Sequence, residues 1–256
     1  SHDEEIGCVG VHSLIDMLAD APVKPVMCIV GEPTSMSIAT GHKGKTAIEA
    51  TCIGSAAHSA LAPQAVNAIH LACDLISQIR HLQDDIAVNG AKDTAYDIPY
   101  TTLNAGLVTG GLALNIVPDH AVVTFEIRNL TTDNPDKILD RLRGAIAPVI
   151  SVARQRAPHA DIEFNVINTY PGLDTPLDDA VVEMLAGLTG SDQRIKVAFG
   201  TEGGLFSQKL GIPAVVCGPG SMAQGHKADE FVTLAQLDAC DEMLEMLVER
   251  LAHGIS

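Results

Sequence analysis

Long apolar runs and basic residues are both scarce in this sequence of 256 residues. No apolar run approaches the ~20 residues that are needed to cross a bilayer, and no basic leader precedes an apolar segment. We therefore expect no membrane association and a cytoplasmic location. Only 16 lysines and arginines stand against 32 aspartates and glutamates, which gives a net charge of -16. Because this charge repels nucleic-acid phosphates, we expect no nucleic-acid partner, and a cationic small substrate is favoured.

The six cysteines show no Cys-x-x-Cys spacing, and most of them lie inside apolar runs. We interpret them as small buried hydrophobic residues of a protein in a reducing compartment. Neither disulfides nor a zinc knuckle are expected.

Helical and strand-like segments alternate along the chain, and 46% of its residues are hydrophobic, which is enough for two domains. A helical stretch and then a short, fully apolar strand, at about 25–33, are typical of an α/β sheet. The order then becomes strand, helix, strand, strand, helix, strand, with helices at about 64–83 and 135–154, as in a split βαβ unit. From Pro171 onward the helix and strand pattern returns, and the chain closes with a long helix.

These patterns predict an α/β domain that is interrupted by an inserted α+β domain of ferredoxin-like order. We place the divisions at 1–44, 45–168 and 169–256. The first strand of the insertion is expected to turn one face inward, formed by Thr46, Ile48, Ala50 and Cys52. The inward face of its first helix is expected to be formed by Ile69, Cys73, Ile76 and Ile79. The segment 83–99 is expected to be a polar loop.

Acidic residues and a histidine lie where apolar segments begin or end. Glu4 and Glu5 precede the first apolar run, Glu32 follows an apolar strand, and His226 lies in a glycine-rich loop after another. Ligands of open α/β sheets bind at the carboxyl ends of strands, so these loops can converge on one crevice. Carboxylates and imidazole suit Zn²⁺, and a carboxylate left uncoordinated can take a proton from metal-bound water. Each residue alone also fits a structural role: acids at a helix N-terminus, a turn cap, or a surface histidine.

Seven segments that cover nearly the whole chain resemble one known family: DEEIGCVG, VGEPT, GHKGK, GSAAHSALAPQAVNAI, GGLALNIVPDHAVVTFEIR, FGTEGGLF and CGPGSMAQGHKADEFV. This is the family of dinuclear zinc amidohydrolases and peptidases, which includes acetylornithine deacetylase, succinyl-diaminopimelate desuccinylase, aminoacylase and carboxypeptidase G2. The segment 200–232 most resembles the acetylornithine deacetylases of that family. The resemblance implies that the α/β domain is catalytic and that the inserted domain mediates dimerisation.

The resemblance also implies roles for the acids and for His226. Glu4 is then the general base, Glu5 and Glu32 bind one zinc each, and His226 completes the C-terminal ligand set. Two Zn²⁺ ions, or Co²⁺ in their place, belong to the complete active site of the family. Relatives carry further ligands in a longer N-terminal region, so the chain resembles the C-terminal part of such an enzyme, inactive by itself.

The substrate side of the resemblance involves five residues. His58 matches the histidine that helps to polarise the scissile carbonyl, and relatives supply it across a homodimer formed through the inserted domain. Asn115 and Arg128 match positions that hold the substrate carboxylate or the carbonyl oxygen, and Gly200 with Thr201 matches a substrate-contacting loop. Structural alternatives remain open: Asn115 as a turn cap, Arg128 as an exposed strand residue, and the segment around Thr201 as a helix N-cap.

The implied reaction is hydrolysis of the amide of a small N-acyl amino acid by a zinc-bridging water that Glu4 deprotonates. The substrate expected first is N-acetyl-L-ornithine, in arginine biosynthesis, with Glu202 attracting its side-chain ammonium. Alternatives are succinyl-diaminopimelate, another aminoacylase or metallopeptidase activity, or a non-catalytic dimerisation module. His42 is left unassigned, with packing as its expected role.

Overall fold

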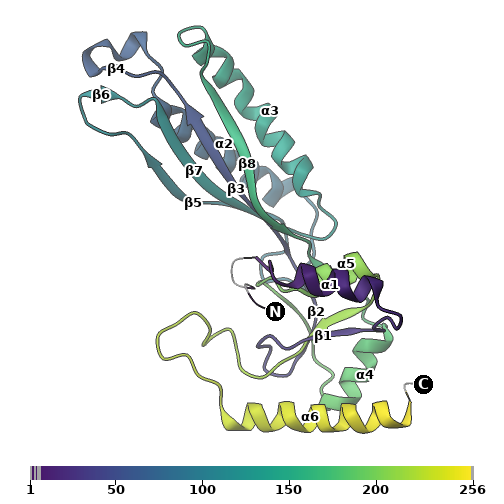
Figure 1. Ribbon diagram of the computed structural model, residues 1–256. Helices are drawn as coiled ribbons and strands as arrows, with labels where there is room; N and C mark the ends of the chain where they lie inside the picture. Colours follow the sequence, from purple (N-terminus) through teal and green to yellow (C-terminus); the bar gives the residue numbers. More distant parts are fainter. Residues whose placement is uncertain (1, 3, 5–6, 255–256) are drawn as a thin grey trace. The chain divides into compact units, whose positions relative to one another are not determined.

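The computed structural model describes residues 2, 4 and 7–254. The chain divides into two compact units, each of which is described by itself here (Figure 1). Unit 1 comprises residues 1–43, 95–97 and 170–256, and unit 2 comprises residues 44–94 and 98–169. In the described part of the chain, no helix has both the length and the apolar character that a membrane span needs.

Unit 1 is built around a small mixed sheet with helices on both faces. Its elements are α1 (Val11–Asp20), β1 (Cys28–Val30), β2 (Ile38–His42), β9 (Leu173–Asp174), α4 (Ala180–Thr189), β10 (Arg194–Val197), α5 (Gly203–Leu210), β11 (Ala214–Val216) and α6 (Leu234–His253). The strand order is β1-β11-β2-β10, with β9 paired to β2. Helices α1 and α5 share one apolar cluster, whereas α4 and α6 share another with β2 and β11. This arrangement confirms the predicted α/β class.

One expectation for unit 1 needs correction, and one helix is added to it. The strand expected at 25–33 is only three residues long and half-buried, because only Cys28–Val30 pairs with β11. A further helix, α5, follows Glu202, where the N-cap alternative had pointed.

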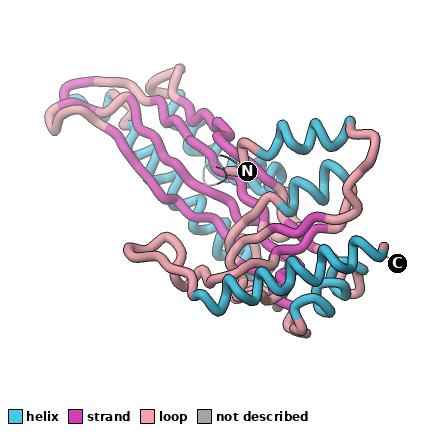
Figure 2. Tube along the Cα trace, turned by 60° about the horizontal axis from the view of Figure 1, so that its bottom comes forward, coloured by secondary structure: helices cyan, strands magenta, loops and turns pink. Residues whose placement is uncertain are grey.

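Unit 2 is a four-stranded antiparallel sheet covered on one face by two helices (Figure 2). Its elements are β3 (Gly44–Ile53), β4 (Ala57–His58), the 3₁₀ helix η1 (Ser59–Gln64), α2 (Ala68–Asn89), β5 (Thr102–Gly110), β6 (Ile116–Val117), β7 (His120–Asn129), α3 (Pro135–Arg154) and β8 (Asp161–Tyr170). The order β5-β7-β3-β8 leaves β5 and β8 at the two edges. The predicted strand, helix, strand, strand, helix, strand order is therefore confirmed, as is the helix over 135–154.

Strand β3 alternates between buried and half-buried residues along its length, and the buried ones are Gly44 and the four predicted residues, Thr46, Ile48, Ala50 and Cys52. The prediction for α2 was right for Ile79, which is buried, and for Ile69 and Ile76, which pack against the same core, but it was wrong for Cys73 and for the bounds of the helix. Asn67 Oδ1 accepts hydrogen bonds from the backbone N–H groups of Ile69 and His70, which starts the helix at Ala68. The buried face is then formed mainly by leucines and isoleucines, while Cys73 is exposed. Residues 83–89, expected in a loop, continue the helix to Asn89.

Candidate functional site

Two loops of unit 1, after β1 and after β11, are hydrogen-bonded to each other. The backbone N–H groups of Thr34 and Ser35 donate to the carbonyl oxygens of Gly218 and Gly220 at 3.2 and 2.6 Å. A Cβ atom at Gly218 would overlap the carbonyl oxygen of Gly31, so only glycine allows this close approach. Because β1 and β11 are parallel neighbours, their carboxyl ends meet at one edge, and Glu32 lies in the first of these loops.

Three carboxylates from distant segments act on one buried thiol beside these loops. Burial, followed by the negative charges of Glu4, Glu202 and Glu32 and a hydrogen bond to Glu4, raises the pKa of Cys8 to about 12. The Cys8 Sγ donates to Glu4 Oε1 at 3.6 Å. Burial and then the charge of Glu202 raise the pKa of Cys28 to about 11. We call Glu4, Glu32 and Glu202 the acidic cluster; it concentrates negative charge where a cation, either a metal ion or an ammonium group, would be stabilised.

The predicted zinc ligands are only partly covered by the structure. Glu5 lies outside the described residues, and His226 is exposed, with a left-handed φ of 59°. The His226 backbone N–H donates to Glu230 Oε2 at 3.2 Å. Among the residues that the structure describes, no three or more histidines, cysteines, aspartates or glutamates are placed to hold a metal ion. The described side chains therefore do not complete a zinc site by themselves, and the ligand assignment stays a prediction.

Gly200 and Thr201 precede α5, and packing and hydrogen bonding account for both residue types. Thr201 is fully buried, and its Oγ1 accepts a hydrogen bond from the Gly203 backbone N–H at 3.0 Å. A Cβ atom at Gly200 would overlap the ring of Tyr170, which is itself buried. Contact of either residue with a substrate stays a prediction.

His58 and Asn115 lie side by side in unit 2. The two-residue strands β4 and β6 pair His58 with Ile116, and the Ser59 backbone N–H donates to the Asn115 carbonyl oxygen at 3.0 Å. Both residues are exposed. The Nδ1 of His58 accepts from the Ala60 backbone N–H at 3.2 Å, so a neutral imidazole carries its proton on Nε2. An exposed Nε2–H is the donor that a developing oxyanion requires.

Arg128 lies far from that pair within the same unit. It is near the end of β7, where it pairs with Lys45 of β3, and its Nε donates to Glu126 Oε1 at 3.1 Å. His58 lies beyond the opposite end of β7, which begins at His120 (Figure 1). At a rise of ~3.4 Å per residue, the eight residue steps from His120 to Arg128 alone span about 27 Å. The structure therefore brings His58 and Asn115 together but does not bring Arg128 to them.

Two lysines lie around Tyr96 in unit 1, an arrangement that sequence reasoning missed. Lys43 Nζ lies 5.6 Å and Lys196 Nζ 5.4 Å from the centre of the Tyr96 ring, and Lys196 also forms an ion pair with Asp174 at 2.5 Å. His42 beside them is fully buried, and its Nδ1 donates to the Lys43 carbonyl oxygen at 2.9 Å. Only the GHKGK motif marked this region, because Tyr96 comes from a distant segment with no recognisable pattern.

The chain is similar to known proteins in both sequence and fold. Residues 40–151 match the M20-type peptidase dimerisation domain. The chain is 29% identical to an acetylornithine deacetylase of Photorhabdus laumondii over 247 aligned residues. The alignment covers 96% of this chain and 61% of that protein. An acetylornithine deacetylase of Myxococcus xanthus is 28% identical over 252 residues, which covers 98% of this chain and 64% of the relative.

Among solved structures, an M20 family metallo-carboxypeptidase from Sulfolobus solfataricus has the same fold, with a TM-score of 0.68 at 19% identity over 94% of this chain and 67% of that one. The chain thus spans a little over three fifths of the length of the two deacetylases. Together the matches are consistent with the M20 family and confirm the resemblance that the sequence motifs indicated.

Proposed function

We propose, on the premise that the chain belongs to the M20 family with which its sequence and fold agree, that it forms part of a metal-dependent amidohydrolase. Its proposed substrate is an N-acyl amino acid, and specifically N-acetyl-L-ornithine in arginine biosynthesis. One observation carries the proposal: besides burial, the negative charges of Glu4, Glu202 and Glu32, which come from three segments of unit 1, all raise the pKa of Cys8, and Glu4 also accepts its hydrogen bond. The named relatives are acetylornithine deacetylases, which supports the substrate.

The acidic cluster has two tasks in this proposal. Glu4 accepts the proton of the attacking water, which requires a basic carboxylate at that position. The proposed zinc ions, held with the help of Glu5, Glu32 and His226, would supply water activation and charge stabilisation. Glu202 offers its negative charge to the ammonium group of ornithine. The free carboxylate of a succinyl group would instead be repelled by the same cluster.

His58 donates its Nε2–H to the oxyanion, and geometry favours its supply by a second subunit. An amino acid with an acetyl group is much shorter than the roughly 27 Å of strand that separates the His58 end of β7 from Arg128. One chain therefore cannot place both residues of unit 2 on one substrate. A homodimer through unit 2, the region of the dimerisation-domain match, would bring His58 of one chain to the substrate that Arg128 of the other holds. The edge strands β5 and β8 are both available for such pairing.

Substitutions in the acidic cluster test the reaction. In the full-length gene product, Glu4→Gln should retain bound metal and lose the rate of N-acetyl-L-ornithine hydrolysis by about 10²–10⁴-fold, because the amide keeps the shape but not the basicity. Glu32→Gln should lose metal as well, as measured by elemental analysis. Glu245→Gln, an exposed residue of α6, is the matched control and should change neither quantity. Near-normal turnover by Glu4→Gln would overturn the base assignment.

Mixing two inactive variants tests the exchange of His58. A dimer of one His58→Ala chain and one Glu4→Gln chain contains one site with both functional residues, so mixing should restore part of the activity. Subunit exchange is verified by native mass spectrometry. If mixed dimers form and no activity returns, donation of His58 by the second subunit is wrong.

A further inference from the structure

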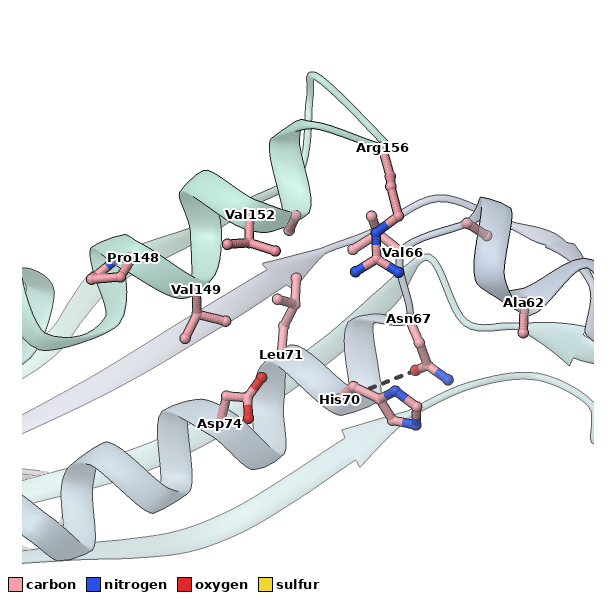
Figure 3. Close-up of a pocket in the computed structure, with 12 residues that line it drawn as sticks. Ala62, Val66, Asn67, His70, Leu71, Asp74, Pro148, Val149, Val152 and Arg156 are labelled. Atoms are coloured by element: carbon pink, nitrogen blue, oxygen red, sulfur yellow. Dashed lines mark hydrogen bonds between the residues drawn. The ribbon is translucent and has the colours of Figure 1, made fainter.

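A cavity of about 490 Å³ lies between α2 and α3 in unit 2 (Figure 3). None of its lining residues belongs to the proposed hydrolytic site. The lining consists of Ala62, Ala65, Val66, Asn67, His70, Leu71, Asp74, Pro148, Val149, Val152, Ala153 and Arg156. Its floor is apolar and buried, whereas its rim carries charged side chains. The volume lies within the ~300–1,000 Å³ range that is usual for small-molecule sites.

The cavity has a local structural cause. Pro148 lies inside α3 and has no N–H, so the helix lacks one of its hydrogen bonds at this point and can bend there. Small side chains at Ala62, Ala65 and Ala153 leave further room. Toward the opposite end of the helix pair, Arg141 of α3 forms an ion pair with Asp85 of α2. The two helices are therefore bridged by a salt bridge at one end and leave space at the other.

Two oppositely charged side chains, Arg156 and Asp74, lie at the rim of the cavity and form no ion pair with each other. Arg156 lies beside Val66 and Asn67, whereas Asp74 lies one turn of α2 beyond His70 (Figure 3). Within the described part of the chain, neither side chain has an ion pair or a side-chain hydrogen bond, so both charged groups are available to a ligand. In a chain of net charge -16, an arginine left unpaired beside a cavity is positioned for an anion from outside the chain.

We propose that this cavity binds a linear zwitterion, with a carboxylate at one end, an ammonium group at the other and an apolar chain between them. The planar guanidinium of Arg156 suits the carboxylate, since it can donate two parallel hydrogen bonds. Asp74 suits the ammonium group, and Leu71 and Val149 contact the chain between. Asp74 is seven residues past Asn67, which is ~10 Å along the helix axis, so the two charges of the ligand must be well separated. Basic amino acids and short peptides both carry this chemistry.

The test uses the 256-residue chain and 6-aminohexanoate as the probe, with binding measured by calorimetry. Arg156→Gln and Asp74→Asn should each weaken binding about tenfold, the usual effect of losing one charge-assisted hydrogen bond. Arg80→Gln and Asp84→Asn, exposed changes of the same kind on α2 outside the lining, are matched controls and should bind as the parent does. Thermal unfolding of each variant shows that it is folded.

Truncated probes complete the test. Hexanoate and hexylamine each lack one of the two charges and should bind at least about tenfold more weakly than 6-aminohexanoate. L-Lysine and trialanine then distinguish the two natural sources, and the tighter binder identifies the class. The proposal is overturned if the folded chain shows no saturable binding of 6-aminohexanoate, if neither natural class binds, or if Arg156→Gln and Asp74→Asn bind it as well as the controls do.

Discussion

Gly200 offers a direct test of whether the segment before α5 is explained by packing. An ideal Cβ atom at Gly200 would overlap the Tyr170 ring, with the ring Cζ 2.5 Å away. Tyr170 is buried, with 7% of its surface exposed, and it belongs to the apolar cluster of α1 and α5. The ring therefore cannot swing into solvent to make room, and Gly200→Ala forces a shift within a packed core.

The size of the effect follows from the cost of overpacking. Adding a methyl group to a well-packed site costs ~1–3 kcal/mol of the free energy of unfolding. For a chain of this size each kcal/mol lowers the melting temperature by roughly 2–4 °C, so about 2 kcal/mol corresponds to about 4–8 °C. Gly187→Ala is the matched control in the same unit: this exposed glycine is in helix α4, and the nearest atom to its Cβ is Arg250 Nη1 at 3.8 Å. It should raise stability by ~0.5–1 kcal/mol.

The assay is thermal unfolding followed by circular dichroism, with a double-mutant cycle to locate the cause. In a Tyr170→Leu background the ring is absent, so Gly200→Ala should cost less than ~0.5 kcal/mol. Equal destabilisation in both backgrounds would refute the clash with Tyr170. A Gly200→Ala protein that is as stable as the parent but binds substrate less well would instead show that substrate contact explains the glycine.

The remaining predictions concern the thiols and the metal. Exposed Cys73 should react with a thiol reagent at pH 8 before buried Cys8 and Cys52, and Cys73→Ser should remove this fast phase. The pKa values of Cys8 and Cys52 are raised to about 12 from an ordinary 9.0, so the stability that these thiols contribute is complete below pH 9 and is lost as the pH rises from 9 to 12. Comparing the alkaline unfolding of the parent with that of Cys52→Ala measures the contribution of Cys52. Finally, the 256-residue chain alone should bind zinc weakly and should not hydrolyse N-acetyl-L-ornithine, since its described residues hold no group of three metal ligands; tight binding of two zinc ions would contradict this.

The sequence by itself determined the elements whose pattern is strictly local. The alternation along β3 identified its buried face, because successive side chains of a strand point to opposite sides. The helix predicted over 135–154 is α3, and its start has a local cause: Asn134 caps it and Pro135 is its first residue. The family motifs likewise lie in short continuous segments, and the comparisons confirmed the family resemblance.

The buried face of α2 shows where local pattern fails. Ile69, Ile76 and Ile79 of the predicted face do pack on the core, but the prediction added Cys73, which is exposed, and left out Leu71 and Leu75. The strands β5 and β7, on which α2 packs, turn the centre of the buried face toward Leu71 and Leu75, with Ile79 shared by the predicted and the observed face. A helix with apolar residues on more than one side is oriented by its neighbours, which a single segment does not contain.

Only the tertiary structure decided which chemically active residues meet. It brought Glu4 into hydrogen-bond contact with Cys8, within the influence of the charges of Glu202 and Glu32, and it separated His58 from Arg128 along the length of β7. Distances of this kind depend on which strands are neighbours and in what register they pair. Those choices are made by the whole core at once, because a strand or helix can bury its apolar face only against partners that come from elsewhere in the chain.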